Sequence, residues 1–308
     1  MKTTSAKPTN NFLVSHFNRV HPIDWTKEFK RKAPIHLEIG FGNGEFLIRQ
    51  SKENPRHNFI GIEIENLLIK KASKRITRAN AKNVRLLKLD VNIALERLFA
   101  QRCLDSVYTL FPFPWPKKRH YHHRLFNKTF LKLVNSRLKT KGAVRIVTDF
   151  KPYYEWVLLR TPNTGFKTKK KTIDPHFNTQ FERKWAEEGQ KSFYQIDLKK
   201  INHISTKVLK EENVTATFIK DFNPKLYAPK NKTGTTSIIF KKFFFNSKEN
   251  CGTQNMLVAE KNLTQKFRVL ICPQGKKWCV SLDHDQDIIK TKGVKESLLQ
   301  IKKACPKI

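Results

Sequence analysis

The sequence predicts an α/β protein whose main part is a doubly wound, mostly parallel sheet, followed by a small C-terminal α+β extension. Up to about residue 160, short apolar runs alternate with segments whose apolar residues recur at the helical period. Three of the apolar runs end in an acidic residue, namely Glu38, Glu63 and Asp90. Strands that alternate with helices form a parallel sheet, and such sheets bind ligands at the carboxyl ends of their strands. The pattern therefore predicts both a fold and the edge of the sheet that carries a site.

The individual elements follow from these runs in chain order. The expected strands are 35–39, 58–63, 84–89, 105–110 and 143–148, and the expected helices are 44–52, 66–79, 92–99 and 126–138. In the last of these helices Phe126, Phe130 and Val134 are four residues apart. Gly142 is expected to end that helix. Residues 161–175 are expected to form a mobile basic loop, and residues 193–198 a closing strand.

A chain of 308 residues can hold one large domain and one small one. The expected division is a basic N-terminal arm at 1–30, the main domain at 31–200 and a C-terminal extension at 201–308. Within the extension, 247–255 is expected to be a linker, followed by strands 256–260, 266–272 and 278–282 and a helix 293–305. These last elements predict an α+β module at 256–308. Its role is open between binding RNA and stabilising the protein.

A glycine-rich turn follows the first expected strand. Gly40, Gly42 and Gly44 let the backbone approach a ligand closely, and the N-terminus of the next helix favours polar or anionic groups. The spacing is G-x-G-x-G and not the G-x-G-x-x-G that binds a dinucleotide pyrophosphate. Glu38, two residues before the first glycine, suits an ammonium group.

The other two acids at strand ends extend this site. Glu63 ends the second strand, 19 residues after Gly44, and suits the hydroxyls of a ribose. Asp90 follows the third strand and is a candidate partner for the amine of an adenine. Together with Glu38 they favour S-adenosylmethionine over a nicotinamide dinucleotide.

A proline loop, residues 110–120 (Leu-Phe-Pro-Phe-Pro-Trp-Pro-Lys-Lys-Arg-His), is the most specific motif in the chain. Its three alternating prolines stiffen an extended loop, since proline can neither continue a helix nor pair in a central strand. The aromatic side chains Phe113 and Trp115 offer flat faces to a nucleic-acid base, and the cations that follow suit phosphates. Those cations and imidazoles are Lys117, Lys118, Arg119, His120, His122, His123 and Arg124. A surface turn with solvated charges is the alternative reading.

These motifs resemble those of the bacterial tRNA (guanine-N7-)-methyltransferases. The resemblance covers roughly residues 30 to 200. It is carried by the segments 37–44, 61–64, 111–120, 145–149 and 178–182, together with Asp90. It implies a Rossmann-like methyltransferase sheet, S-adenosylmethionine as cofactor and tRNA as substrate, with methyl transfer to a guanine of the variable loop, usually at tRNA position 46.

The resemblance also implies roles for individual residues. Asp149 and the segment Thr179, Gln180, Phe181 and Glu182 are expected to contact the target guanine, and Lys117 and Arg119 the RNA. The family usually carries an aspartate, often regarded as catalytic, where this chain has Phe113. Phe113, Asp149 and Glu182 are therefore the expected catalytic positions. For Asp149 the alternative is an N-cap ahead of Lys151, and for Glu182 a solvated charge.

Guanine N7 carries a lone pair and no proton, so attack on a sulfonium methyl needs alignment and no general base. The methyl transfer moves a positive charge to the purine, which a nearby carboxylate stabilises. Methylation of an exocyclic amine ranks low, because Phe111-Pro-Phe-Pro offers only backbone carbonyls as acceptors. A noncatalytic RNA-binding protein on the same fold is the alternative outside this class, and Phe113 is its main support.

Composition agrees with a nucleic-acid partner. The chain has 61 Lys and Arg against 26 Asp and Glu, a formal net charge of +35. Such a balance favours polyanions whatever the sequence, although an AT-rich genome would also enrich lysine. Because the charge coincides with the proline loop, RNA is expected rather than an anionic membrane.

The remaining expectations concern location and cysteine chemistry. The first eight residues lack the apolar core of a signal peptide and no run approaches a membrane span, so a cytoplasmic protein is expected. The five cysteines include no C-x-x-C pair and are expected to be free thiols, with Cys272 and Cys279 able to face each other across a hairpin. No metal and no obligatory protein partner are expected, and a monomer is the simplest state.

Overall fold

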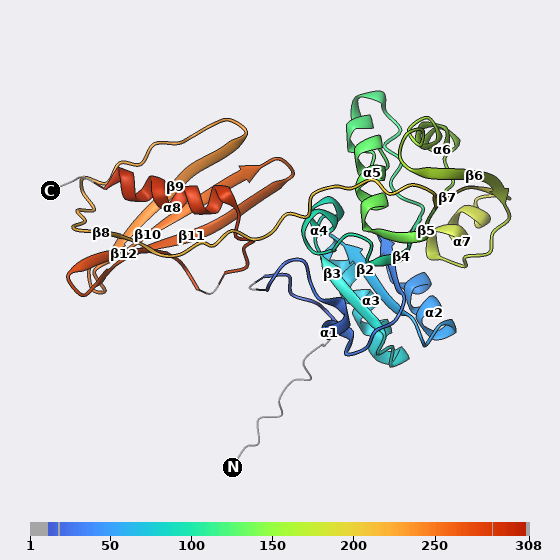
Figure 1. The fold of residues 1–308 in the computed structure, drawn as a ribbon, viewed down its shortest axis with the longest axis horizontal. Helices are drawn as coiled ribbons and strands as arrows, with labels where there is room; N and C mark the ends of the chain where they lie inside the picture. Colours follow the sequence, from blue (N-terminus) through green and yellow to red (C-terminus); the bar gives the residue numbers. More distant parts are fainter. Residues whose placement is uncertain (1–11, 18, 285, 306–308) are drawn as a thin grey trace, which may run out of the picture. The chain divides into compact units, whose positions relative to one another are not determined.

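The computed structural model describes residues 12–17, 19–284 and 286–305, which fall into two compact units (Figure 1). The N-terminal unit comprises 12–15 and 21–209, and the C-terminal unit the rest. Residues 1–11 of the expected basic arm lie outside the described residues. The described part of that arm is folded: Val14 donates a backbone hydrogen bond to Leu86, and helix α1 (Trp25–Phe29) buries both of its terminal aromatic residues.

A seven-stranded sheet forms the centre of the N-terminal unit. Its strands are β1 (Ile35–Ile39), β2 (Asn58–Glu63), β3 (Val84–Lys88), β4 (Leu104–Leu110), β5 (Leu138–Thr148), β6 (Phe166–Ile173) and β7 (Phe193–Lys200). They lie in the order β3-β2-β1-β4-β5-β7-β6, with β1 to β5 parallel to one another and β7 antiparallel to both of its neighbours, β5 and β6. The order reverses between β1 and β4, which is where doubly wound sheets bind ligands. The predicted mostly parallel, doubly wound sheet is confirmed.

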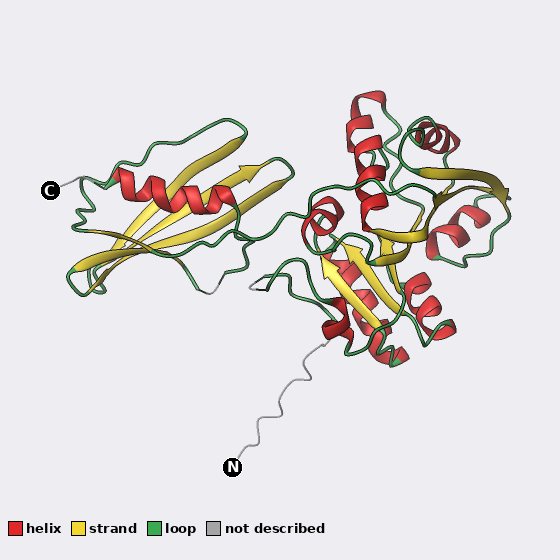
Figure 2. Ribbon diagram, in the orientation of Figure 1, coloured by secondary structure: helices red, strands yellow, loops and turns green. Residues whose placement is uncertain are grey.

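Helices cover both faces of this sheet (Figure 2). They are α2 (Glu45–Glu53), α3 (Asn66–Ala79), α4 (Val91–Arg97), α5 (Lys128–Arg137), α6 (Lys151–Leu158) and α7 (Gln180–Glu187), with a 3-10 turn η1 (Lys118–His123). Leu47 of α2 and Ala72 of α3 pack with Phe59 in one buried cluster. A second cluster, which includes Phe130 of α5 and Val157 of α6, contains the side chains of the other face.

Two expected elements differ from the structure because sheet pairing overrides the local pattern. The helix expected at 126–138 ends at Arg137, and Gly142 lies within β5, since Leu138 already pairs with Leu104. The loop expected at 161–175 contains β6, which pairs with β7 along its whole length. Its run of lysines is typical of an edge strand, where charge discourages pairing with another chain.

The C-terminal unit is an antiparallel sheet with one helix packed on it (Figure 1). Its elements are β8 (Thr217–Ile219), β9 (Thr236–Asn246), β10 (Cys251–Glu260), β11 (Leu263–Gln274), β12 (Lys277–Leu282) and α8 (Lys292–Ala304), with strand order β8-β12-β11-β10-β9. Val258, Val269 and Val280 form the core with Leu298 and Ile301 of α8. The expected linker 247–255 is instead a tight turn and the first half of β10, so the α+β fold begins well before residue 256.

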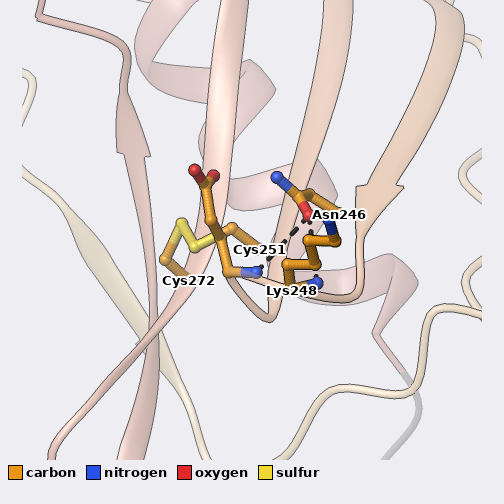
Figure 3. Close-up of a disulfide and its surroundings, with 5 residues drawn as sticks. Asn246, Lys248, Cys251 and Cys272 are labelled. Atoms are coloured by element: carbon orange, nitrogen blue, oxygen red, sulfur yellow. Dashed lines mark hydrogen bonds between the residues drawn. A yellow bond between two sulfur atoms is a disulfide. The ribbon is translucent and has the colours of Figure 1, made fainter.

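Two of the cysteines form a disulfide in this unit (Figure 3). Cys251 and Cys272 lie on the neighbouring strands β10 and β11 with their Cα atoms 4.5 Å apart. The prediction that all five cysteines are free thiols is therefore wrong for this pair, because residue 251, expected in a linker, begins β10 and lies beside β11. Cys272 also pairs in register with Cys279, as expected for a hairpin. Asn246 shapes the preceding turn by accepting hydrogen bonds from the backbone N–H groups of Lys248 and Glu249.

Candidate functional site

The glycine turn after β1 forms the floor of the candidate site. Gly40, Gly42 and Gly44 all have positive φ, at 67°, 57° and 80°. Such angles strain any other L-residue. A Cβ at Gly44 would also lie 2.9 Å from the Cβ of Ala72 in α3, so the close packing of turn and helix requires glycine. The turn therefore brings bare backbone to the carboxyl ends of the strands.

Glu38 lies at the end of β1 with 4% of its surface exposed. Burial raises the pKa of its carboxyl well above the ordinary value, while Arg49 lowers that pKa and Glu63 raises it. Its Oε2 atom is buried and has no hydrogen-bond partner among the described residues. A buried acceptor without a partner is costly, so this oxygen is suited to a cationic ligand group.

Glu63 and Asp90 lie at the next two strand ends and already accept backbone hydrogen bonds. Glu63 Oε2 accepts from the N–H of Gly42 at 3.2 Å and Oε1 from that of Ile64 at 2.8 Å. Asp90 is the N-cap of α4, and its Oδ1 accepts from the N–H of Asn92 at 2.8 Å. These bonds orient both carboxylates and leave further lone pairs for a ligand.

A small cavity of about 120 Å³ lies over the glycine turn. Its lining is Glu38, Gly40, Phe41, Gly42, Asn43, Glu45, Phe46, Leu68, Lys71, Leu110, Thr179, Gln180 and Phe181. Small-molecule sites usually measure about 300–1,000 Å³. A ligand larger than the cavity must therefore also occupy the open edge toward Glu63 and Asp90, which do not line it.

The segment 176–183, here called the covering segment, closes one side of the cavity. Gln180 Oε1 accepts from Asn43 Nδ2 at 2.9 Å, and both carboxylate oxygens of Glu45 accept from Arg183 Nη2 at 3.0 Å. The ring of Phe181 lies about 4.0 Å from where a Cβ on Gly42 would be. The covering segment is thus fastened to the turn and helix that carry the cofactor-side residues.

Glu182 supports the covering segment from inside. It is 2% exposed, and its Oε1 accepts backbone hydrogen bonds from His176 at 2.8 Å and Phe177 at 3.0 Å. Its Oε2 accepts from the N–H of Asn178. Both oxygens therefore bind backbone groups of the covering segment. This role differs from the expected contact with a purine and from the alternative of a solvated charge.

Thr179 has a similar structural task. It is buried and caps α7 by accepting from the N–H of Glu182 at 3.2 Å. Of the four residues of this segment expected to contact the target base, Gln180 and Phe181 are exposed, Phe181 to 48%.

The proline loop leaves the end of β4 and holds its aromatic rings near the surface. Phe113 is 67% exposed and lies edge-on to Trp115 at a ring distance of 4.8 Å. Arg124, expected in the cationic patch, is instead 1% exposed. Its Nε donates to the carbonyl of Pro114 at 2.9 Å and its guanidinium stacks on Tyr121 at 3.6 Å. Arg124 therefore stabilises the proline loop from its buried side. The exposed cations of the loop are Lys117, Lys118 and Arg119.

Asp149 follows β5 next to the base of the proline loop. Leu110 and Val147 pair in register, so the chain after each strand leaves the sheet side by side. The N-cap of α6 is Phe150, so the N-cap alternative for Asp149 is wrong. Burial raises the pKa of the Asp149 carboxyl, and no side chain among the described residues forms an ion pair or hydrogen bond with it.

The residues that bind the covering segment to the glycine turn and α2 are not among those predicted from the sequence. Asn43 and Glu45 had no assigned role, although both lie in or directly after the glycine turn. Arg49 was also missed, and it donates to the carbonyl of Phe177. Their position within five residues of the glycines was the available signal, but their partners are more than 120 residues away.

Within the described residues, the rings of His120 and His123 pack against Trp115 and the ring of His122 packs against His123. No group of His, Cys, Asp or Glu in this part of the chain is arranged to hold a metal ion. The same part of the chain has no helix with the length and hydropathy of a membrane span.

Comparisons with known proteins show which family the chain resembles. The family model described as "Putative methyltransferase" matches residues 32–195. A tRNA (guanine-N(7)-)-methyltransferase of Chlorobium phaeobacteroides is 44% identical over 177 residues, covering 58% of this chain and 87% of that protein. The protein of the same name from Thermotoga maritima is 31% identical over 293 residues, covering 91% of this chain and 92% of its own length. A solved 16S rRNA methyltransferase, KamB, covers 58% of this chain and 93% of its own at 12% identity, with a TM-score of 0.47.

The doubly wound sheet, the glycine turn and the matching family model define a class I methyltransferase that uses S-adenosylmethionine. The chain belongs to the tRNA (guanine-N7-)-methyltransferase family. Because the N-terminal unit ends at residue 209, the match to the T. maritima protein extends into the C-terminal unit.

Proposed function

We propose that this protein transfers a methyl group from S-adenosylmethionine to N7 of a variable-loop guanine in tRNA, at position 46. Transfer to guanine N7 in tRNA agrees with the names of the curated relatives. The observation in the structure that carries the proposal is Glu38, a buried carboxylate with a partnerless oxygen above a bare glycine turn. A noncatalytic RNA-binding protein would have no use for that costly arrangement.

Three carboxylates fit the polar groups of the cofactor. Glu38 would hold the ammonium of its methionine part, Glu63 its ribose hydroxyls and Asp90 its adenine amine. When bound, S-adenosylmethionine supplies an electrophilic methyl on a sulfonium. The glycine turn and the covering segment exclude water from that end of the site, which strengthens the attraction between Glu38 and the ammonium.

The protein has to align the guanine, because N7 needs no deprotonation. Phe113, exposed at the end of β4, offers a face for stacking, a contact that contributes about 1–3 kcal/mol per base. Asp149 lies at the neighbouring strand end and has no cationic partner among the described residues. We assign to Asp149 the stabilisation of the positive charge that develops on the purine, a role the family usually gives to an aspartate at the position of Phe113.

Glu182 takes a different role from the one the sequence predicts. Since both of its oxygens accept backbone hydrogen bonds, we assign it as a positioning residue that holds the covering segment in place. Phe181 remains in position to contact the base or the cofactor. Lys117 and Arg119 are exposed and are proposed to contact tRNA phosphates.

Methyl transfer to unmodified tRNA, followed by mapping of the modified base, tests the proposal. The expected product is 7-methylguanosine in the variable loop. The same tRNA with adenosine at position 46 is the matched control and should stay unlabelled. Label on an exocyclic amine, or none on any tRNA, would refute the proposed reaction.

A further inference from the structure

A groove of about 560 Å³ lies beside the cofactor cavity, between α2, α3 and the start of α7. Its lining is Glu45, Ile48, Arg49, Lys52, Arg75, Arg78, Ala79, Asn178 and Arg183. Five of these nine residues are Lys or Arg, against 61 of 308 in the whole chain, so the groove is enriched beyond the general basic composition. We call it the arginine groove.

The type of cation in the arginine groove also departs from the composition. The chain contains 45 lysines and 16 arginines, yet the groove has four arginines and one lysine. A bias toward lysine in the whole sequence therefore does not explain it. Arginine presents a planar fork of donors that matches phosphate oxygens in two-point contacts.

The charges of the arginine groove are only partly compensated. Glu45 is its single carboxylate and contacts both Arg183 at 3.0 Å and Arg75 at 3.3 Å. Lys52 and Arg78 form no ion pair with any described residue. Arg49 also pairs with Glu53, which lies outside the lining, at 3.9 Å. Five cations against these two carboxylates leave a local excess of three positive charges in an open groove, which favours a polyanion.

The arginine groove adjoins the cofactor cavity, because Glu45 lines both of them. Asn178 and Arg183 belong to the covering segment, so an anion in the groove would touch the segment that closes the site. We propose that the arginine groove binds backbone phosphates of the tRNA next to the methylated guanine. The proposal rests on the proposed function and adds a second RNA-contacting surface to the cations of the proline loop.

A double substitution of Arg75 and Arg78 tests the groove. Both arginines are exposed on α3, and neither fastens the covering segment. Arg75→Gln with Arg78→Gln removes two charges, and Lys70→Gln with Lys74→Gln removes two exposed charges of the same helix that do not line the groove. The affinities of both variants for tRNA are measured over a range of salt, together with their affinities for S-adenosylmethionine and their melting temperatures.

Each lost phosphate contact should weaken tRNA binding about five- to eightfold at 0.1 M salt and reduce the salt slope by about 0.7–0.9. The groove variant should therefore bind tRNA roughly 25- to 60-fold more weakly, with the affinity for S-adenosylmethionine preserved. The lysine control should stay close to wild type. Equal behaviour of the two variants, an unchanged salt slope, or a loss of cofactor affinity in the groove variant would each overturn the proposal. Methylation by the wild-type protein reports separately on the proposed function.

Discussion

Replacing Glu182 with glutamine separates a positioning role from a catalytic one. The carboxylate accepts hydrogen bonds from three consecutive backbone N–H groups, at 2.8 Å from His176, at 3.0 Å from Phe177 and from Asn178. A glutamine keeps the shape of the side chain but has a single acceptor oxygen. Its amide N–H group would face a backbone N–H group, so that two hydrogen-bond donors would meet. At least one buried N–H therefore loses its partner.

The expected effect of Glu182→Gln on local opening of the covering segment follows from the charge and the burial of Glu182. A hydrogen bond to a charged group contributes about 1.5–3 kcal/mol, which corresponds to a change of roughly 10- to 150-fold in a local opening equilibrium. Hydrogen exchange of the amides of His176, Phe177 and Asn178 should accelerate by about that factor in Glu182→Gln. Affinity for S-adenosylmethionine should fall with it, because the covering segment lines the cofactor cavity. Turnover at saturating cofactor and tRNA should change little.

The matched control is Glu187→Gln, an exposed position on the same helix that removes the same charge. It should leave the exchange of residues 176–178 and the cofactor affinity unchanged. If Glu182→Gln instead abolished turnover at saturating substrates while amide exchange stayed at the wild-type rate, the reasoning would be refuted. Glu182 would then act on the purine itself.

Five further substitutions, at four positions, test the rest of the site. Glu63→Ala removes acceptors for the ribose and should weaken S-adenosylmethionine binding roughly ten- to hundredfold in a calorimetric titration; unchanged binding would place the ribose elsewhere. Burial raises the pKa of Glu38 above 4.5, and an ammonium would favour its ionised form, so cofactor binding below the raised pKa releases a proton. Affinity should therefore rise with pH below that pKa and level off above it, and Glu38→Gln should abolish this dependence. Asp149→Asn should lower turnover about 30- to 1,000-fold with cofactor affinity preserved, since a carboxylate about 4 Å from the purine contributes at most roughly 4 kcal/mol at an effective dielectric of 20. Phe113→Ala should act mainly on tRNA affinity, and a Phe113→Asp variant with many-fold higher turnover would contradict the role given to Asp149.

Local patterns in the sequence determined the fold of the N-terminal unit and the positions of its strand-end residues. Apolar runs of the right length and period specify β1 to β5 and the helices between them, and the carboxyl ends of parallel strands then have to meet at one edge. Glu38, Glu63 and Asp90 were placed there by chain position alone. The role of the three glycines could also be predicted from the sequence, because positive φ angles in a strand-to-helix turn require glycine.

Tertiary structure decided which way the charged side chains face. Glu182 is expected from the sequence to contact the purine and Arg124 to belong to an exposed cationic patch, but both are buried and form hydrogen bonds with nearby backbone groups. The same holds for β6 and the first half of β10, whose polar sequences become strands only because a partner strand supplies the pairing. The Cys251–Cys272 disulfide depends on that pairing, since it joins cysteines 21 residues apart. The composition and hydrophobic period of a segment indicate the secondary structure that it prefers in isolation. Its burial and strand pairing depend instead on the residues from the rest of the chain that pack against it.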